Sequence, residues 1–246
     1  MRLMIFSDIH GNLEALKSVI THASGKNVHR RICLGDIVGY GPQPEECIRL
    51  VQSLNKCRVL AGNHDVATLW KTSPYGMSPA AKKVILWTMD QLSPESKEYL
   101  TALPDRLDFA EMTFTHANPY NPLGWRYVLD RKQAMRCFAA TRNQHLFIGH
   151  SHRPVIFTRK TFLSVDIQAV PGSMQIKLDD SRRRIVNCGS VGQPRDKDSR
   201  ACYIIFDTRT QLLEYYRVEY DVEITAKAVE RAGLPFILAK RLHKGI

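Results

Sequence analysis

The residues of this chain that could do chemistry lie in five short polar motifs, each of which follows an apolar run. The motifs are Asp8-Ile9-His10, Gly35-Asp36, Gly62-Asn63-His64-Asp65, Thr115-His116 and Gly149-His150-Ser151-His152. Carboxylates and neutral imidazoles supply the oxygen and nitrogen donors that bind manganese, iron, zinc or nickel. A carboxylate has two oxygens and can bridge two ions, and Asp36 is the candidate for that position. The motifs together predict a site for two metal ions.

The spacing within two of these motifs favours chelation. Asp8 and His10 are two residues apart, so on a regular strand both side chains would face the same way and could bind one ion. His150 and His152 repeat that spacing. The Asp-x-His pair alone is weak, because a surface strand end often carries such residues. The Gly-His-x-His pair is the stronger signal, because two neutral imidazoles at this spacing are rarely needed for packing. The occurrence of both pairs in one chain with the other motifs favours a metal site over coincidence.

The apolar runs before the motifs are typical of short β-strands. We predict strands at residues 3–6, 31–34, 58–60, 112–114 and 146–148. All five ligand groups would then leave comparable strand ends. Ends of neighbouring strands can converge on one edge of a sheet, where open α/β folds bind their ligands. The sequence therefore predicts that the motifs meet at a sheet edge.

Helical patterns alternate with these strands and predict a parallel α/β opening. We predict helices at residues 12–23, 44–54, 78–102, 131–140 and 222–240, the third interrupted at Ser93-Pro94 and forming a cap or flank beside the site. After His152, short β segments around residues 155, 167, 175, 185, 204 and 213 predict a mainly antiparallel sheet packed on the first. The expected fold class is α/β, a four-layer α/β/β/α sandwich of two mixed β-sheets flanked by helices, in a single domain over residues 1–246.

Length and composition exclude several classes of protein. The chain has 246 residues, of which 44% are hydrophobic, enough for a core without further support. Its six cysteines form no C-x-x-C pair, and no apolar run is long enough for a signal peptide or a membrane span. We therefore expect a reduced, cytoplasmic protein that does not enter a membrane. The sequence leaves the oligomeric state open.

The formal net charge of +11 at pH 7 favours polyanionic partners in general. The basic residues are scattered, with small clusters at residues 159–160, 182–184 and 240–244, and form no long stripe interleaved with aromatic residues. An ordinary solvated surface that helps to attract a phosphorylated substrate is the favoured interpretation. Nucleic acid is the less favoured partner.

The motifs in this order resemble the signature of the calcineurin-like metallophosphoesterase superfamily, which reads D-x-H, G-D, G-N-H-[DE], a later His and G-H-x-H. The resemblance covers nearly the whole chain and implies two divalent ions, manganese first and iron, zinc or nickel as alternatives. It implies that one ion is bound by Asp8, His10, Asp36 and His152, and the second by Asp36, Asn63, His116 and His150. It also implies that a hydroxide bridging the ions attacks phosphorus, while His64 stabilises the phosphate or protonates the leaving oxygen.

The stretch after Gly35-Asp36 distinguishes branches of this superfamily. Its protein serine/threonine phosphatases and symmetrical diadenosine tetraphosphatases carry an acidic residue and an Arg shortly after the motif. Here Gly39 and Tyr40 replace them, so His64 lacks that orienting partner and a phosphoprotein phosphatase is disfavoured. Residues 35–42, 115–119 and 187–195 instead resemble a compact bacterial and archaeal branch, whose members are commonly labelled as predicted phosphodiesterases or diadenosine-tetraphosphatase-like hydrolases.

The resemblance therefore implies hydrolysis of a phosphodiester or phosphoanhydride of a small nucleotide. Diadenosine-tetraphosphatase-like activity is the first expectation, and a general or cyclic-nucleotide phosphodiesterase is the alternative. A nuclease, a phosphoprotein phosphatase and a non-catalytic scaffold are less favoured. The scaffold is disfavoured because no member of the ligand set is missing.

Residues 189–195 are the candidate wall of the substrate pocket. Their glycines would let the backbone approach a ligand closely, and Arg195 could clamp a phosphate with two parallel hydrogen bonds. A β-turn with a solvated Arg is the alternative. Arg126 and Arg131 are near His116 in sequence and could line the same opening.

Three loop aromatics and two polar residues have both a functional and a structural interpretation. Tyr40, Trp125 and Tyr127 could stack on a nucleobase, although such residues often serve packing. Asp65 could simply complement a helix dipole, so it is left out of the catalytic set. Asn12 is interpreted as a helix N-cap rather than a substrate contact.

Overall fold

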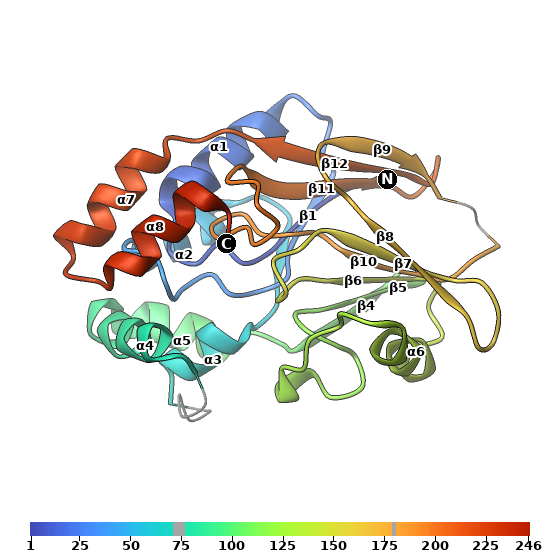
Figure 1. The fold of residues 1–246 in the computed structure, drawn as a ribbon, viewed down its shortest axis with the longest axis horizontal. Coiled ribbons are helices and arrows are strands. Elements are labelled where there is room, and N and C mark those ends of the chain that lie inside the picture. The colour runs from blue at the N-terminus through green and yellow to red at the C-terminus, as the bar shows by residue number, and fades with distance from the viewer. Residues whose placement is uncertain (71–76, 179–180) are drawn as a thin grey trace.

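The computed structural model describes residues 1–70, 77–178 and 181–246, and its centre is a pair of six-stranded β-sheets (Figure 1). The first sheet has the order β3 (Cys57–Val59), β2 (Arg30–Cys33), β1 (Arg2–Phe6), β11 (Ala201–Asp207), β12 (Leu212–Val218), β9 (Met174–Lys177). The second sheet has the order β4 (Arg106–Phe109), β5 (Met112–Thr115), β6 (His145–Ile148), β10 (Arg184–Asn187), β7 (Val155–Arg159), β8 (Val165–Ala169). Every predicted strand is present, and β4 has no counterpart among the predictions.

The side chains of β1 alternate between two buried faces. Leu3 and Ile5 join the apolar cluster between the two sheets, whereas Met4 and Phe6 join the cluster beneath the first pair of helices. The outer faces of the sheets are covered by α1 (Leu13–Ser24), α2 (Pro44–Ser53) and, on the second sheet, α6 (Arg131–Ala140). The layers are therefore helix, sheet, sheet and helix, which confirms the predicted sandwich.

The division of the chain between the sheets differs from the prediction. We expected the second half to form its own antiparallel sheet, yet β9, β11 and β12 join the first sheet, and β4, β5 and β6 belong to the second. Both sheets are mixed: β1, β2 and β3 run parallel, as do β5, β6 and β10. All residues of β11 are buried, and this strand pairs antiparallel with β1 on one side and β12 on the other. An apolar run indicates burial, but it does not identify the neighbouring strand.

The predicted helices are present, and their ends have recognisable causes. Asn12 caps α1 by accepting a hydrogen bond from Ala15 N at 3.1 Å. The expected interruption separates α4 (Pro79–Gln91) from α5 (Pro94–Thr101), which Ser93 caps by accepting from Ser96 N. The closing segment is two helices, α7 (Val222–Arg231) and α8 (Phe236–Lys244), because Gly233 adopts a φ of +66° just before Pro235. The short elements α3 (Asn63–Thr68) and η1 (Pro122–Gly124) lie in loops beside the motifs.

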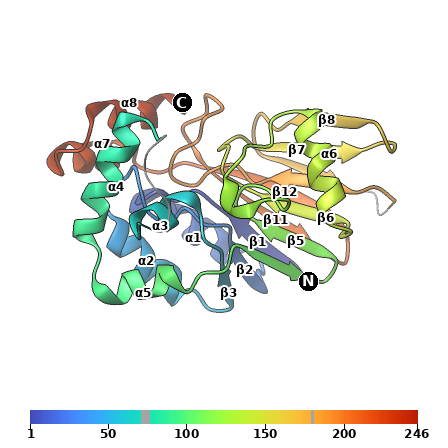
Figure 2. The same ribbon diagram turned by 90° about the horizontal axis from the view of Figure 1, so that it is seen from below.

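The helices α4, α7 and α8 lie together at one end of the molecule (Figures 1 and 2). Val84 of α4, Val229 of α7 and Leu238 of α8 belong to one buried apolar cluster, against which Tyr40 packs. The helices predicted at residues 78–102 therefore share this end with the C-terminal helices. Across residues 1–70, 77–178 and 181–246, no helix has the length and apolar character needed to cross a membrane.

Candidate metal centre

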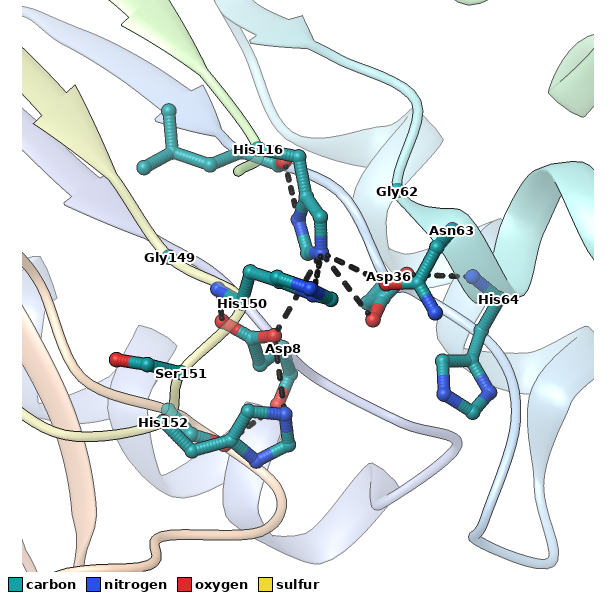
Figure 3. Close-up of polar contacts among 12 residues, drawn as sticks. Asp8, Asp36, Gly62, Asn63, His64, His116, Gly149, His150, Ser151 and His152 are labelled. Atoms are coloured by element: carbon teal, nitrogen blue, oxygen red, sulfur yellow. Dashed lines mark hydrogen bonds and ion pairs between the residues drawn. The ribbon is translucent and has the colours of Figure 1, made fainter. Parts of the chain in front are cut away.

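The five polar motifs meet at the carboxyl ends of parallel strands (Figure 3). The first three motifs follow β1, β2 and β3, and the last two follow β5 and β6 of the other sheet. The expectation of one sheet edge is therefore wrong, because both sheets contribute. The potential ligand atoms lie within 4.8 Å of one another in three overlapping groups: Asp8, His10 and His152; His10, Asp36 and His64; Asp36, His116 and His150.

The backbone of the motifs is left-handed rather than strand-like. Values of φ between 50° and 63° occur at Asp8, His10, Asp36, His150 and His152. Because β1 already ends at Phe6, the regular strand that we expected to align Asp8 and His10 is not there. A left-handed residue other than glycine costs on the order of 1–3 kcal/mol. Backbone hydrogen bonds offset part of that cost: Asp8 N donates to Gly35 O at 3.0 Å, and His10 N donates to Asp36 O at 2.9 Å.

One set of donor atoms surrounds the space between His10 and His152. The Nδ1 atom of His10 lies 3.1 Å from Val38 O, and that of His152 lies 2.5 Å from Gln193 O. A carbonyl only accepts, so each Nδ1 carries the proton and each Nε2 of the neutral rings presents a lone pair. These two Nε2 atoms nevertheless face each other at a distance of 3.1 Å. Asp8 Oδ1 lies 3.2 Å from His152 Nε2. Electron-rich atoms converge here.

A second set of donor atoms surrounds His116 and His150. His116 Nδ1 donates to Leu34 O at 3.0 Å, and His150 Nε2 donates to Trp125 O at 2.8 Å. The other ring nitrogens, His116 Nε2 and His150 Nδ1, are 3.2 Å apart, and each presents a lone pair when its ring is neutral. Asn63 Oδ1 lies 3.2 Å from His116 Nε2. Figure 3 shows these side chains directed toward one another.

Asp36 lies between the two sets. Its Oδ2 atom is 3.6 Å from His10 Nε2 and 3.3 Å from His116 Nε2. Asp36 Oδ2 and Asp8 Oδ1 are buried and accept no hydrogen bond from the residues that the structure describes. Buried carboxylate oxygens without hydrogen bonds, opposed to imidazole nitrogens, are favourable only with positive charge beside them, which a ring proton or a bound metal ion can supply. The residues therefore fit divalent metal ions that accept mixed nitrogen and oxygen ligands.

The electrostatics of the cluster agree with that fit. Burial lowers the pKa of His10 well below its ordinary value and that of His150 to about 3, so both rings are neutral, as metal ligands must be. Burial also acts to lower the pKa of His116, but the charge of Asp36 outweighs it and raises the pKa to about 9. Burial raises the pKa of Asp36, but the neighbouring imidazoles outweigh this effect. The pKa of Asp36 therefore lies well below its usual range. His116 is therefore protonated at pH 7 in the metal-free cluster, and a metal ion at its Nε2 would replace that proton. The centre thus favours added positive charge.

Comparison with known proteins gives the family. Residues 1–211 match the calcineurin-like phosphoesterase superfamily domain. The chain belongs to this superfamily. A metallophosphoesterase of Sphaerobacter thermophilus is 38% identical, with a TM-score of 0.90 and coverage of 100% of this chain and 99% of that one. An uncharacterized protein of Methanocaldococcus jannaschii is 35% identical, with 99% of this chain and 98% of that protein covered.

A further similarity covers a shorter stretch. The symmetrical bis(5'-nucleosyl)-tetraphosphatase of Psychromonas ingrahamii is 35% identical over 71 residues, which cover 28% of this chain and 26% of that protein. The superfamily is metal-dependent, and the clustered Asp and His residues of this phosphoesterase could bind the metal.

In this phosphoesterase, His64 is the second residue of α3 and is positioned by packing. Its backbone N donates to Asp36 Oδ1 at 2.8 Å, while its buried Nδ1 has no hydrogen-bond partner in the described part of the chain. The ring centroid of Tyr40 is 4.5 Å from that of His64, and a Cβ added to Gly39 would be 2.4 Å from Nδ1. Gly39 and Tyr40, which replace the orienting residues of related branches, therefore hold the ring by contact. Burial lowers the pKa of His64 to about 4.

Asp65 has a larger structural role than its sequence position indicates. Its carboxylate accepts hydrogen bonds from the backbone N atoms of Asp36, Ile37, Val38 and Gly62, at 2.8, 2.9, 3.2 and 2.9 Å. Burial and then the charge of Asp36 raise its pKa to about 7, against the effect of these N–H donors. Asp65 thereby joins the second and third motifs. The acidic residue after Asn63-His64 was the available signal, but one sequence does not show which distant N–H groups it meets.

A cavity of about 570 Å³ opens beside the metal centre. Among the predicted contact residues, Tyr40, Trp125, Tyr127 and Arg195 line it. The Tyr127 ring stacks on His150 with centroids 4.3 Å apart. Arg126 is exposed and lies outside the cavity wall.

Two further predicted segments have different placements. Arg131 Nε donates to Val165 O at 3.0 Å, and its side chain lines another depression of the surface. In residues 189–195, the backbone N of Gly192 donates to Asp8 O at 2.9 Å, and Ser190 Oγ donates to the same oxygen at 2.9 Å. This segment therefore also holds the first motif in place.

Proposed function

We propose that this protein is a dinuclear metal-dependent phosphoesterase that hydrolyses a phosphodiester or phosphoanhydride of a small nucleotide. The observation that carries the proposal is Asp36 Oδ2, a buried oxygen without a hydrogen bond that faces two sets of donor atoms. The proposed ligands of one ion are Asp8, His10, Asp36 and His152, and those of the second are Asp36, Asn63, His116 and His150. Manganese is proposed first, with iron, zinc or nickel as alternatives.

The contacts support a proposed role in catalysis for each group of the site. When bound, two such ions would lower the pKa of a coordinated water molecule and stabilise the attacking and leaving oxygens. The backbone carbonyls described above fix the imidazole orientations, so that the ring nitrogens that would bind the metal face the centre before any ion arrives. His116 Nε2 would release its proton when an ion binds. His64 is neutral at pH 7, and its ring N–H can donate a hydrogen bond to the phosphate or to the leaving oxygen. Arg195, at the cavity wall, can bind a phosphate oxygen.

A dinucleoside polyphosphate is the first substrate class that we propose. The cavity combines Arg195 with the aromatic rings of Tyr40, Trp125 and Tyr127, which suit phosphate and base respectively. A relative over 71 residues is named as a symmetrical bis(5'-nucleosyl)-tetraphosphatase. A general or cyclic-nucleotide phosphodiesterase is the alternative, because the same ligand set suits a diester. Nuclease, phosphoprotein phosphatase and scaffold functions are less favoured.

The test is a hydrolysis screen of purified, manganese-loaded protein with its metal content measured. The substrates are diadenosine tetraphosphate, bis-p-nitrophenyl phosphate, p-nitrophenyl phosphate, 2',3'-cyclic AMP and single-stranded RNA. We expect His64→Ala to keep its manganese and to lose about 10²–10⁴-fold in turnover. Asp36→Ala should lose both metal and activity. His243→Ala, at an exposed histidine of α8, is the matched control and should behave as wild type.

The outcomes separate the alternatives. Cleavage of diadenosine tetraphosphate to ADP, well above the other rates, would support the tetraphosphatase. Hydrolysis of diesters alone would support a phosphodiesterase. Unchanged turnover of Asp36→Ala would refute the dinuclear assignment, and no His64-dependent activity with any tested metal would favour the scaffold.

We also propose that residues 1–246 act as one domain in the cytoplasm. All six cysteines are free, and five of them are buried. Free, buried thiols are typical of a reducing compartment.

A further inference from the structure

A guanidinium group without a partner contributes to the wall of the metal-centre cavity. Arg241 of α8 lines this cavity together with Arg195 and Tyr40. In residues 1–70, 77–178 and 181–246, no hydrogen bond or ion pair is made by its half-buried side chain. Arg195 differs, because its Nη2 donates to Gln193 Oε1 at 2.7 Å and its Cζ lies 5.6 Å from the Tyr40 ring centroid. The N–H donors of Arg241 are therefore free to bind an anion in the cavity.

The packing of α8 fixes the position of this arginine. Leu238 and Leu242, on either side of it in sequence, are buried, and Leu238 packs with Val84 of α4 and Val229 of α7. Lys83 of α4 further donates to Gly233 O, in the turn before α8, at 3.3 Å. Arg241 is thus presented by a packed helix. It also lies beyond residues 1–211, which match the family domain.

The charges of the cavity exceed what a single phosphate requires. Asp36 is the sole carboxylate among the described residues that line it, whereas Arg195 and Arg241 are both cationic. With two divalent ions, the charges of Asp8, Asp36 and the proposed hydroxide would leave about one positive charge at the centre, which the roughly single negative charge of an attacked internal phosphate already balances. The two arginines are additional. They complement a substrate that carries negative charge beyond the phosphate that is attacked.

From this geometry we propose that Arg241 determines substrate specificity by binding a phosphate adjacent to the one held at the metal centre. The preferred substrate class is then a nucleotide with a phosphoanhydride chain, rather than a diester with one phosphate. This inference rests on the proposed function, and it selects between the two substrate classes left open there. The bidentate geometry of a guanidinium suits a non-reacting phosphate, which must be held but not attacked.

The first test compares two ligands that differ by one phosphate. Manganese-loaded protein is titrated calorimetrically with AMP and with α,β-methylene-ADP, whose carbon bridge resists hydrolysis, at constant free manganese. Arg241→Ala should weaken binding of α,β-methylene-ADP about tenfold and leave that of AMP within about twofold. Arg241→Lys should fall between wild type and Arg241→Ala. Lys240→Ala, which removes the same charge at an exposed position of the same helix, should bind both ligands as wild type does.

The second test uses catalysis. For diadenosine tetraphosphate, Arg241→Ala should raise KM about tenfold with a smaller change in kcat, whereas its kcat/KM for bis-p-nitrophenyl phosphate should fall no more than about twofold. Lys240→Ala should match wild type with both substrates. Equal loss for AMP and α,β-methylene-ADP, an equal effect of Lys240→Ala, or no effect of Arg241→Ala would each overturn the inference. If no substrate is hydrolysed, the proposed function fails, yet the binding comparison still decides whether Arg241 recognises a second phosphate.

Discussion

Substitution of Asp65 by Asn should destabilise the fold while changing the shape of one side chain very little. Each carboxylate oxygen accepts two backbone N–H groups: Oδ1 those of Ile37 and Val38, and Oδ2 those of Asp36 and Gly62. An amide retains one acceptor oxygen and places an NH₂ group against the other two donors. Leaving a buried donor unsatisfied costs about 1–3 kcal/mol, so two donors amount to about 2–6 kcal/mol.

The matched control is Asp130→Asn. Asp130 is the exposed N-cap of α6, where its carboxylate accepts from Gln133 N at 2.7 Å. Asn is about as good as Asp at an N-cap, so this variant should lose no more than a few tenths of a kcal/mol. The assay is urea unfolding of the metal-free proteins at about pH 8, above the pKa of about 7 of Asp65, with wild-type m values required.

The same variant should also bind manganese more weakly. Asp65 holds residues 36–38, which supply the Asp36 carboxylate and the Val38 carbonyl that orients His10. Loss of a group that orients a ligand typically costs 10–100-fold in metal affinity, and we expect about that loss here. A loss of stability below about 1 kcal/mol, or equal to that of Asp130→Asn, would refute the assignment of Asp65 as the link between the motifs.

Two further predictions test the packing of His64 and the junction before α5. Gly39→Ala should lower turnover about 100-fold without loss of metal, because the new Cβ would lie 2.4 Å from His64 Nδ1; wild-type kcat at full metal content would contradict this. Burial raises the pKa of Glu45, but hydrogen bonds from Ser96 and Ser93 outweigh it and hold the pKa below its usual 4.5. Its stabilising effect is therefore present above pH 4.5 and lost as the pH falls through the lower folded-state pKa, so Glu45→Gln should lower unfolding stability at neutral pH and have little effect at acid pH. Equal losses at both pH values would contradict this sign.

The sequence predicts what depends on neighbouring residues. The apolar runs identify the strands that precede the ligands, and Asn12 and Ser93 identify helix starts because capping is local. What depends on distant parts of the chain is missed. One feature that the sequence does not predict is the pairing of β11 with β1, because the residues of a buried strand do not show which strand lies beside it.

The wall of the cavity is the second case. Arg126 was a candidate because it is near His116 in sequence, yet it is exposed outside the cavity. Arg241, far along the chain, lines the cavity because α8 packs on α4 and α7. Trp125 and Tyr127, on either side of Arg126 in sequence, do line the cavity, so proximity along the chain does not settle which side chains face a ligand. Specificity residues are therefore harder to predict than metal ligands.

The interlocking of the motifs explains why the metal ligands are easier to predict. A Cβ on Gly62, in the third motif, would lie 2.1 Å from Asp36 Oδ1 of the second. A Cβ on Gly149, in the fifth motif, would lie 2.6 Å from Asp8 Oδ2 of the first. Each glycine thus leaves room for a carboxylate that belongs to another motif. A single motif can be explained by its local structure alone. The five motifs as a set are constrained by these contacts between them, and for this physical reason the set predicts the metal ligands better than any one motif does.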